Sequence, residues 1–276
     1  MPLRYIVRGS KHMSTPSTSS PAVTRADVVQ ALITVGVAPG DTVFAHSSLR
    51  AFGHVGGGAD TVIDALMEAV GPAGTVVMPA FTWDSFHDKA GVVFDMVRTP
   101  SETGRITEVF RQRPGVVRSP HICHSVAAAG ASAAEVTRDS PSVYAQGGPF
   151  DALLRLNAWN VFLGVSFGSC TALHMAEEQA RVPYRQNRDF RDCRVIHPDG
   201  SATASASVEF LRKQGYWNDF SRVEAVFERE GVLREARVGA ARILNIRMRD
   251  VVRIARRLLD EDIYWLLAAE CRPGKA

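Results

Sequence analysis

The chain has 276 residues, of which 46% are hydrophobic, so it can bury a large core as one big domain or two small ones. Its formal net charge is only +3, which gives no electrostatic reason to expect nucleic-acid binding. No apolar run approaches the roughly 20 residues of a membrane-spanning helix. These totals favour a soluble globular protein with neither a nucleic acid nor a membrane as its partner.

Residues 1–20 have the character of an expression leader, and we exclude them from the predicted fold. The segment is rich in Ser, Thr and Pro, and it carries Arg4, Arg8 and Lys11 without any acidic residue. Without these three cations the formal charge falls from +3 to about zero. We expect residues 21–276 to form a single domain whose C-terminal part, from about residue 194, is a smaller subdomain.

The four cysteines are too far apart in sequence to suggest a disulfide framework. They are Cys123, Cys170, Cys193 and Cys271. Such spacing favours reduced thiols and a cytoplasmic location.

Helix and strand patterns alternate along most of the chain. The predicted helices cover about residues 24–35, 61–70, 104–112 and 149–157, and the predicted strands cover 41–46, 74–81, 125–129 and 160–165. The first two strands and the helix between them form a βαβ unit, which brings His46 and Phe81 to one edge of the sheet. We predict a three-layer α/β/α fold with a central mixed sheet. Further along, residues 201–210 alternate as a half-exposed strand would, and the last sixty residues read as Arg-rich helices.

The strand at residues 160–165 runs into a turn of small residues and then into a helix that carries His174 and Glu177. Positions three apart share a helix face, so the imidazole and the carboxylate should lie side by side. An imidazole is suited to proton transfer near pH 7, and a carboxylate beside it can orient it. A histidine on a helix face is, however, more often a packed or surface residue than a catalyst.

The turn before that helix reads Gly-x-Ser-x-Gly around Ser166, which is the pattern of the nucleophile elbow in serine hydrolases. A hydrolase also needs an acid and then a histidine later in the chain, and Asp189 or Asp192 followed by His197 satisfies that order. The pattern is short and arises often by chance. The residues alone therefore leave a hydrolase and a transferase equally open.

The His46-Ser47-Ser48-Leu49 segment lies at the end of a predicted strand, where open α/β sheets place their ligands. Its two hydroxyls and its imidazole predict a ligand-binding segment. The three glycines at 56–58 precede a helix and could hold an anion, but no Lys-Ser/Thr follows them, so they do not form a P-loop. A plain tight turn explains them equally well.

A second polar segment, residues 118–125, precedes another predicted strand. It contains His121 and His124 beside Cys123, and such a pair of histidines could begin a zinc site. No second pair of ligands accompanies it in the sequence, so we predict no metal. A polar ligand-binding loop is the better interpretation.

Seven blocks of sequence, in order between about residues 24 and 185, resemble a known family. The blocks are His46-Ser47-Ser48-Leu49 with Phe52-Gly53 and 56–59, then 74–82, 100–104, 117–130, 149–151, the Gly164-Val165 turn, and Thr171-x-Leu173-His174-x-x-Glu177. The chain thereby resembles the aminoglycoside 3-N-acetyltransferases, the antibiotic N-acetyltransferase family. Weaker similarity continues to about residue 265.

The resemblance implies direct transfer of an acetyl group from acetyl-CoA to the 3-amine of the deoxystreptamine ring of an aminoglycoside. It implies that His174 is the general base, that Glu177 orients it, and that Thr171 stabilises the developing oxyanion. Ser166 then has no covalent role. The residues implied to hold coenzyme A are His46, Ser47, Ser48, Leu49, Phe52, Gly53, Ser119, His121, Ser125 and Val126.

The acceptor amine is expected to meet a local group of polar and acidic side chains. The residues that we assign to it are Thr82, Asp84, Glu102, Tyr144 and Glu178, with Asp88 and Asp95 as further acids near the expected cleft. The chain departs from the family at Ile122, where proline is usual, and in its nearly neutral charge, where family members tend to be acidic. The alternatives are an acetyltransferase of another amine, a hydrolase that uses Ser166, and a binding protein without activity; we expect a monomer or a homodimer.

Overall fold

A mixed seven-stranded sheet forms the centre of the computed structural model, which describes residues 21–87 and 89–272. The strand order is β11-β12-β6-β1-β2-β5-β4. The strands are β1 (Thr42–Ser47), β2 (Thr75–Pro79), β4 (Val117–Arg118), β5 (Val126–Gly130), β6 (Trp159–Leu163), β11 (Arg234–Val238) and β12 (Ala241–Arg247). Strand β1 pairs in parallel with β2 and β6, while β5 and β12 run antiparallel beside them.

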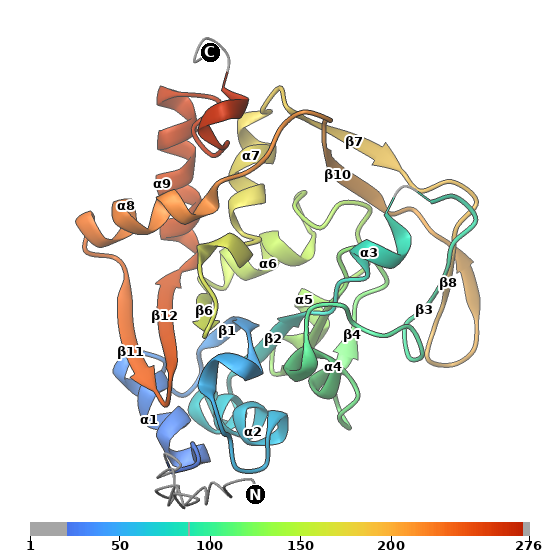
Figure 1. Ribbon diagram of the computed structural model, residues 1–276. Coiled ribbons are helices and arrows are strands. Elements are labelled where there is room, and N and C mark those ends of the chain that lie inside the picture. The colour runs from blue at the N-terminus through green and yellow to red at the C-terminus, as the bar shows by residue number, and fades with distance from the viewer. Residues whose placement is uncertain (1–20, 88, 273–276) are drawn as a thin grey trace, which may run out of the picture.

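The two faces of this sheet bury alternate residues of each strand, as the two-residue period of a strand requires. In β1, Phe44 packs into the core on one face, whereas Val43 and Ala45 pack into the core on the other. In β6, Phe162 and Val161 divide between the two cores in the same way. Both faces are therefore covered, which confirms the predicted three-layer α/β/α architecture (Figure 1).

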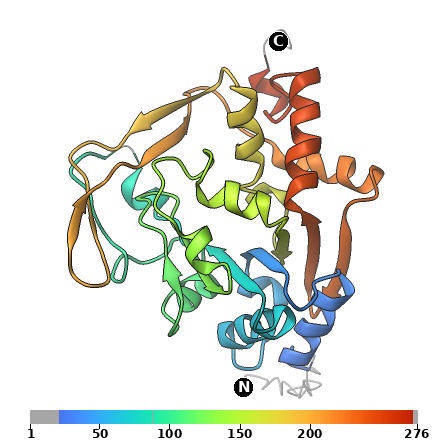
Figure 2. The same cartoon turned by 180° about the vertical axis from the view of Figure 1, so that it is seen from behind.

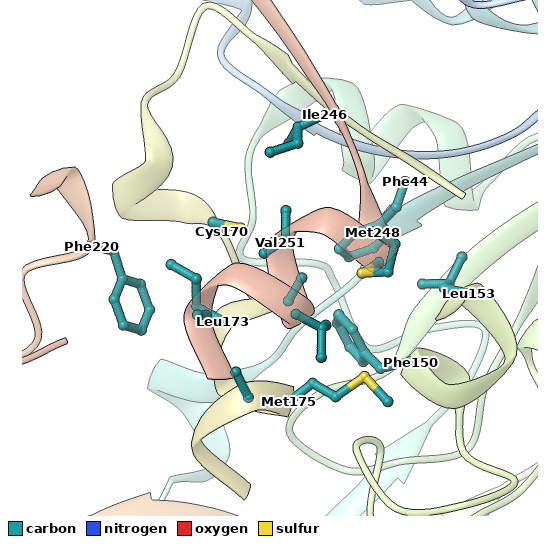
Figure 3. Packing of buried hydrophobic residues seen from close by; sticks show 14 of the residues in the cluster. Phe44, Phe150, Leu153, Cys170, Leu173, Met175, Phe220, Ile246, Met248 and Val251 are labelled. Atoms are coloured by element: carbon teal, nitrogen blue, oxygen red, sulfur yellow. The ribbon is translucent and has the colours of Figure 1, made fainter. Parts of the chain in front are cut away.

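One face of the sheet is covered by α1 (Arg25–Thr34), α2 (Ala59–Val70) and α4 (Arg105–Arg111). The other face is covered by α5 (Ala133–Val136), α6 (Pro149–Arg155), α7 (Leu173–Ala180), α8 (Val223–Arg229) and α9 (Met248–Glu261). Phe150 and Leu153 of α6 gather with Met248 and Val251 of α9 in this second core (Figure 3). Seen from behind, the two helical layers still lie on opposite sides of the sheet (Figure 2).

Two small sheets stand beside the central one. Strand β7 (Arg185–Asp189) pairs with β10 (Val208–Arg212), and β8 (Arg194–Ile196) pairs with β3 (Val93–Asp95) and β9 (Ala202–Ala204). They lie on the right in Figure 1, next to the short helix α3 (Trp83–Phe86). In the part of the chain that the structure describes, the remaining elements are the 3-10 turns η1 (Leu49–Phe52), η2 (Phe167–Ser169), η3 (Phe220–Arg222) and η4 (Ala269–Cys271).

The expectation that the last sixty residues are helical was wrong over residues 234–247. This stretch forms the hairpin of β11 and β12, and β12 inserts beside β6 in the central sheet. Ile243 and Leu244 are both buried, one in each core, so the strand is apolar on both faces and lacks simple alternation. The chain beyond residue 194 thus contributes both to the small side sheets and to the central sheet. No helix in the described ranges is long and apolar enough to cross a membrane.

Candidate active site

Two cavities meet at the side chain of His174. The smaller, of about 310 Å³, lies at the carboxyl ends of β1 and β2, where His46, Ser47 and Pro79 line it. The larger, of about 670 Å³, lies between α3, α7 and the segment that follows β10. Gly168, His174 and Phe220 line both cavities. The imidazole therefore stands where two ligands, one in each cavity, would meet.

His174 is the second residue of α7, and Glu177 lies one turn further along the same helix. His174 Nδ1 is 2.6 Å from Glu177 Oε2. An ionised carboxylate only accepts hydrogen bonds, so Nδ1 must carry the proton and Nε2 keeps its lone pair. Nε2 has no hydrogen-bond partner among the described residues, although the side chain is 22% exposed. The helix thus presents an imidazole in the tautomer that a general base needs.

Glu177 is completely buried but is surrounded by donors. Tyr184 Oη donates to Oε1 over 3.0 Å, and Asn218 Nδ2 donates to the same oxygen over 2.7 Å. Arg185 Nε lies 2.6 Å from Oε2 in an ion pair that lacks the alignment of a hydrogen bond. A buried charge with this many partners is held rigidly, so the ring of His174 has one favoured orientation.

The electrostatics of the pair keep the imidazole neutral and the carboxylate charged. Burial lowers the pKa of His174 below its ordinary value of 6.5, and Arg185 lowers it further, although Glu177 opposes both. Burial alone would raise the pKa of Glu177, but Arg185 and the imidazole outweigh it and hold that pKa below its ordinary value. At neutral pH the pair is therefore ready to accept a proton at Nε2.

The smaller cavity contains polar atoms that the protein itself leaves without partners. His46 Nε2 and Ser47 Oγ are both buried, and neither has a hydrogen-bond partner in the described chain. The His46 ring stacks on Phe162, and burial lowers its pKa to about 3, so it stays neutral. Unpartnered buried polar atoms carry a free-energy cost that a polar ligand can remove. Thr171 lines the same cavity.

The rest of the strand-end segment does not reach either cavity. Ser48 donates its backbone N–H to the carbonyl of Leu163, Leu49 and Phe52 are the ends of η1, and Gly53 follows with a positive φ. Gly164 lies against this segment. A Cβ atom at position 164 would collide with the Cβ atom of Ala51, which explains the glycine in this turn. Ser48, Leu49, Phe52 and Gly53 line neither cavity, so their assignment to coenzyme A remains a prediction.

The second predicted coenzyme segment is buried and bonded within the fold. Ser119 Oγ accepts from the N–H of Val126 over 2.9 Å, and Ser125 Oγ donates to the carbonyl of Ala80 over 2.7 Å. None of these residues lines either cavity. Their hydroxyls hold the strand end of β5 in place, which positions the cavity walls.

His121 is also engaged on both ring nitrogens. Nδ1 accepts from the N–H of His124 over 3.0 Å, and Nε2 donates to the carbonyl of Val208 over 3.1 Å. Burial lowers its pKa to about 4, so the ring is neutral. Within the described ranges, no group of three metal-ligating side chains converges.

Of the residues assigned to the acceptor, only Tyr144 lines the larger cavity, and its buried hydroxyl has no partner among the described residues. Thr82 is buried and donates to the carbonyl of Ile122. Glu102 accepts from the N–H groups of Asp84 and Ser85 at the start of α3, over 2.7 and 3.0 Å.

Two other acids in the expected acceptor group also lie off the cavities. Glu178 accepts from Ser142 Oγ over 3.3 Å, and Asp95 accepts from backbone N–H groups that follow β3. Asp88 lies outside the described residues. The structure thus brings Tyr144, but none of the described predicted acids, to the cleft.

The cleft contains functional groups that the sequence did not reveal. His87 Nδ1 lies 2.6 Å from Glu209 Oε1, and the two residues are 122 positions apart. The His87 ring also stacks on Trp83, with 4.1 Å between the ring centres. Arg185 and Arg212 reach the cleft from the β7–β10 ribbon. No local motif marks these residues, because a long-range strand pairing brings them to the site.

Comparison with known proteins identifies the family. The sequence model of the aminoglycoside 3-N-acetyltransferase family matches residues 44–260. Aminoglycoside N(3)-acetyltransferase VII of Streptomyces paromomycinus is 30% identical to this chain over 282 residues, which is 91% of this chain and 95% of that protein. The chain belongs to the aminoglycoside 3-N-acetyltransferase family.

Solved structures of this family share the fold. The structure of AAC-IIIb in a binary complex with CoASH aligns with a TM-score of 0.77 at 27% identity, covering 87% of this chain and 97% of that one. A histidine-to-alanine mutant of AAC(3)-IVa in complex with a gentamicin aligns with a TM-score of 0.75 at 27% identity, covering 94% and 99%. The resemblance inferred from the sequence is confirmed, and so is the class of enzyme: a CoA-dependent acyltransferase of this family.

Ser166 lacks the surroundings of a hydrolase nucleophile. Its Oγ accepts from the N–H of Gly168 over 3.3 Å, and its backbone is extended, with φ −94° and ψ 178°, rather than strained as at a nucleophile elbow. His197, which a triad would need, instead hydrogen-bonds Thr203 Oγ1 over 2.9 Å. The described residues place no histidine within hydrogen-bonding reach of Ser166 Oγ.

Proposed function

We propose that this protein transfers an acetyl group from acetyl-CoA directly to an amine, with His174 as the general base. The observation that carries the proposal is the position of His174 between two cavities, with Nε2 unpartnered among the described residues. A transferase that acts directly must bring two substrates to one base, and this geometry provides a compartment for each.

The smaller cavity is the proposed site of the thioester arm. Ser47 Oγ and His46 Nε2 would supply the polar contacts there, since both are buried without partners in the described chain. Acetyl-CoA would supply the activated acetyl group. Thr171 lines the same cavity within three positions of His174, and its hydroxyl is the proposed donor to the oxygen that gains negative charge.

His174 would accept the proton that the attacking amine must lose. Nε2 has the lone pair for this step, because Nδ1 donates to Glu177. The resulting imidazolium would be stabilised by the Glu177 carboxylate, which Tyr184 and Asn218 hold in place. General base catalysis of this kind contributes about 10²–10⁴-fold in rate.

Direct transfer is favoured over an acyl-enzyme because the thiol in the smaller cavity is not activated as a nucleophile. Cys170 lines the smaller cavity, but burial raises its pKa to about 12, so it is not a thiolate at neutral pH. All four cysteines are free thiols, in keeping with the proposed cytoplasmic location.

We propose the 3-amine of an aminoglycoside as the first acceptor to test, because the relatives are named for that activity. The experiment follows thiol release from acetyl-CoA against a panel of amines that includes gentamicin, glucosamine and simple alkylamines. We expect one class of amine to be acetylated, with no acetylated protein in intact-mass spectra after incubation with acetyl-CoA alone.

The matched variants are Ser166→Ala and His174→Ala. S166A should keep wild-type turnover and H174A should lose it. A stable acetyl-protein, or loss of activity in S166A together with labelling of Ser166 by a fluorophosphonate, would replace direct transfer with a covalent mechanism.

A further inference from the structure

The wall of the larger cleft is basic. Arg185, Arg212 and Lys213 line it together with His87, His124 and His174, and no Asp or Glu of the described chain is among its lining residues. A polycationic acceptor would need carboxylates at this wall to offset its charge. The predicted acids Asp84, Glu102 and Glu178 lie elsewhere or are bonded to the fold.

The basic wall is built by the pairing of β7 with β10. Arg212 lies directly opposite Arg185 in this antiparallel ladder, and Lys213 follows immediately. Like charges at directly opposed positions destabilise a strand pair unless an anion offsets them. Glu177 offsets Arg185, from which it lies 2.6 Å away.

Arg212 is left without a carboxylate in the described ranges. Its guanidinium lies over the Trp217 ring, 4.9 Å from the ring centre, and Nη1 donates to Asn218 Oδ1 over 3.4 Å. Lys213 Nζ donates to the carbonyl of Pro183 over 2.6 Å, and no described carboxylate pairs with it. Arg212 and Lys213, at the end of one strand, thus line the cleft without an ion pair to any described carboxylate.

We propose that the larger cleft selects an acceptor amine that also carries an oxyanion, a phosphate or a carboxylate, and that Arg212 and Lys213 bind this group. The guanidinium of Arg212 can donate two parallel hydrogen bonds to either oxyanion. Trp217 and Tyr216 flank it in the cleft and offer flat surfaces for a ring of the acceptor. This inference rests on the proposed acetyl transfer at His174, and among the amines to be tested there it favours an anion-bearing acceptor over the polycationic aminoglycoside.

Coenzyme A also carries phosphates, so the same chemistry has a second source. The acceptor is favoured because the unpartnered atoms of His46 and Ser47 lie in the smaller cavity, on the other side of His174 from Arg212. Under the proposed function, the thioester arm occupies that cavity. The cations then lie on the acceptor side.

The test measures binding of inorganic pyrophosphate to the enzyme saturated with coenzyme A, followed by tryptophan fluorescence, since Trp83 and Trp217 line the cleft. The variants are Arg212→Gln and Lys213→Gln, and the matched control is Arg229→Gln, an exposed residue at the end of α8 outside the cleft. We expect R212Q and K213Q each to weaken binding about 10-fold, the effect of one charge-assisted hydrogen bond, and R229Q to leave it unchanged.

Three results would overturn the proposal. Pyrophosphate that binds only the free enzyme and is displaced by coenzyme A would assign the cations to the coenzyme phosphates. Absence of binding, or equal weakening in R229Q, would remove the site. Turnover of gentamicin with a KM that falls in R212Q and K213Q would show that a polycation occupies the cleft. Failure of the proposed function would give a different result: no amine would be acetylated, although pyrophosphate would still bind.

Discussion

Two histidines that line the larger cleft, His174 and His87, are each paired with a buried glutamate behind the cleft wall, and the two pairs are built in different ways. His174 and Glu177 are three residues apart on one helix, whereas His87 and Glu209 are 122 residues apart and meet only in the folded protein. In both pairs Nδ1 lies 2.6 Å from the carboxylate, and both glutamates are buried. The local geometry of the two pairs is therefore nearly the same.

The two pairs differ in the cavities that their histidines line and in the further partners of their glutamates. His174 lines both cavities, whereas His87 lines only the larger one and stacks on Trp83. Glu177 also accepts from Tyr184 and Asn218, while Glu209 is bridged to Arg188. A histidine–carboxylate pair is thus not sufficient to assign the proposed base. What distinguishes His174 is its position between the two cavities.

The largest expected effect is the loss of kcat in His174→Ala, compared with a smaller loss in His87→Ala. His174→Ala should lower kcat by about 10²–10⁴-fold, because no other base borders both cavities among the described residues, while coenzyme A binding stays nearly intact. His87→Ala should mainly raise KM for the acceptor, with kcat reduced less than about 10-fold. Thiol-release kinetics and calorimetric titration with coenzyme A measure both. More than about a tenth of wild-type turnover in H174A, or an equal loss of kcat in H87A, would contradict the assignment.

Substitution of the two glutamates should separate an effect on kcat from an effect on the free energy of unfolding. Both carboxylates are buried in charged networks, so Glu177→Gln and Glu209→Gln should each destabilise the protein by about 3–5 kcal/mol in denaturant unfolding. Only E177Q should also lower kcat, by roughly 10-fold or more, because it removes the charge that orients and stabilises the imidazole of the base. Unaltered kcat in E177Q would show that the orientation of His174 does not depend on this carboxylate.

The smallest expected effect is on the pH profile. The proposed base must be neutral, so activity should be lost as the pH falls through the pKa of His174. Burial and Arg185 hold that pKa below 6.5, which places the acidic limb of kcat/KM below pH 6.5. Arg212 also lowers this pKa, so Arg212→Gln should move the acidic limb toward higher pH. The same limb in R212Q and wild type would show that the cleft cations do not act on the base.

Much of the central fold was predictable because its signals are local. The residues of β1, β2, β5 and β6 show buried apolar runs. Helix α1 starts within the predicted range at a capping box, where Thr24 and Asp27 each accept from the backbone of the other. The order strand, helix, strand over β1, α2 and β2 predicts the α/β class. It also predicts that His46 and Phe81 lie at the same edge of the sheet, where both line the smaller cavity. The hairpin of β11 and β12 was missed because burial on both faces removes the two-residue period.

The candidate residues that line the cavities include those whose sequence signals are local. His174 and Glu177 were identified because three residues make one helical turn, and Thr171 and the strand end at His46 and Ser47 lie close to elements that the sequence marks clearly. Ser119, Ser125 and His121 were matched by motif, but the structure places them within the wall of the fold, bonded to its backbone. Their assignment to coenzyme A stays a prediction.

The sequence by itself determined the helix that pairs His174 with Glu177. It also determined the parallel strands whose carboxyl ends lie near that helix, and the family resemblance. Only the tertiary structure decided the character of the larger cleft. The cations Arg185 and Arg212 come together through the register of β7 and β10, and Glu209 reaches His87 from the same ribbon. Short-range spacing carries no information about such contacts, because they depend on which distant strands pair and in which register.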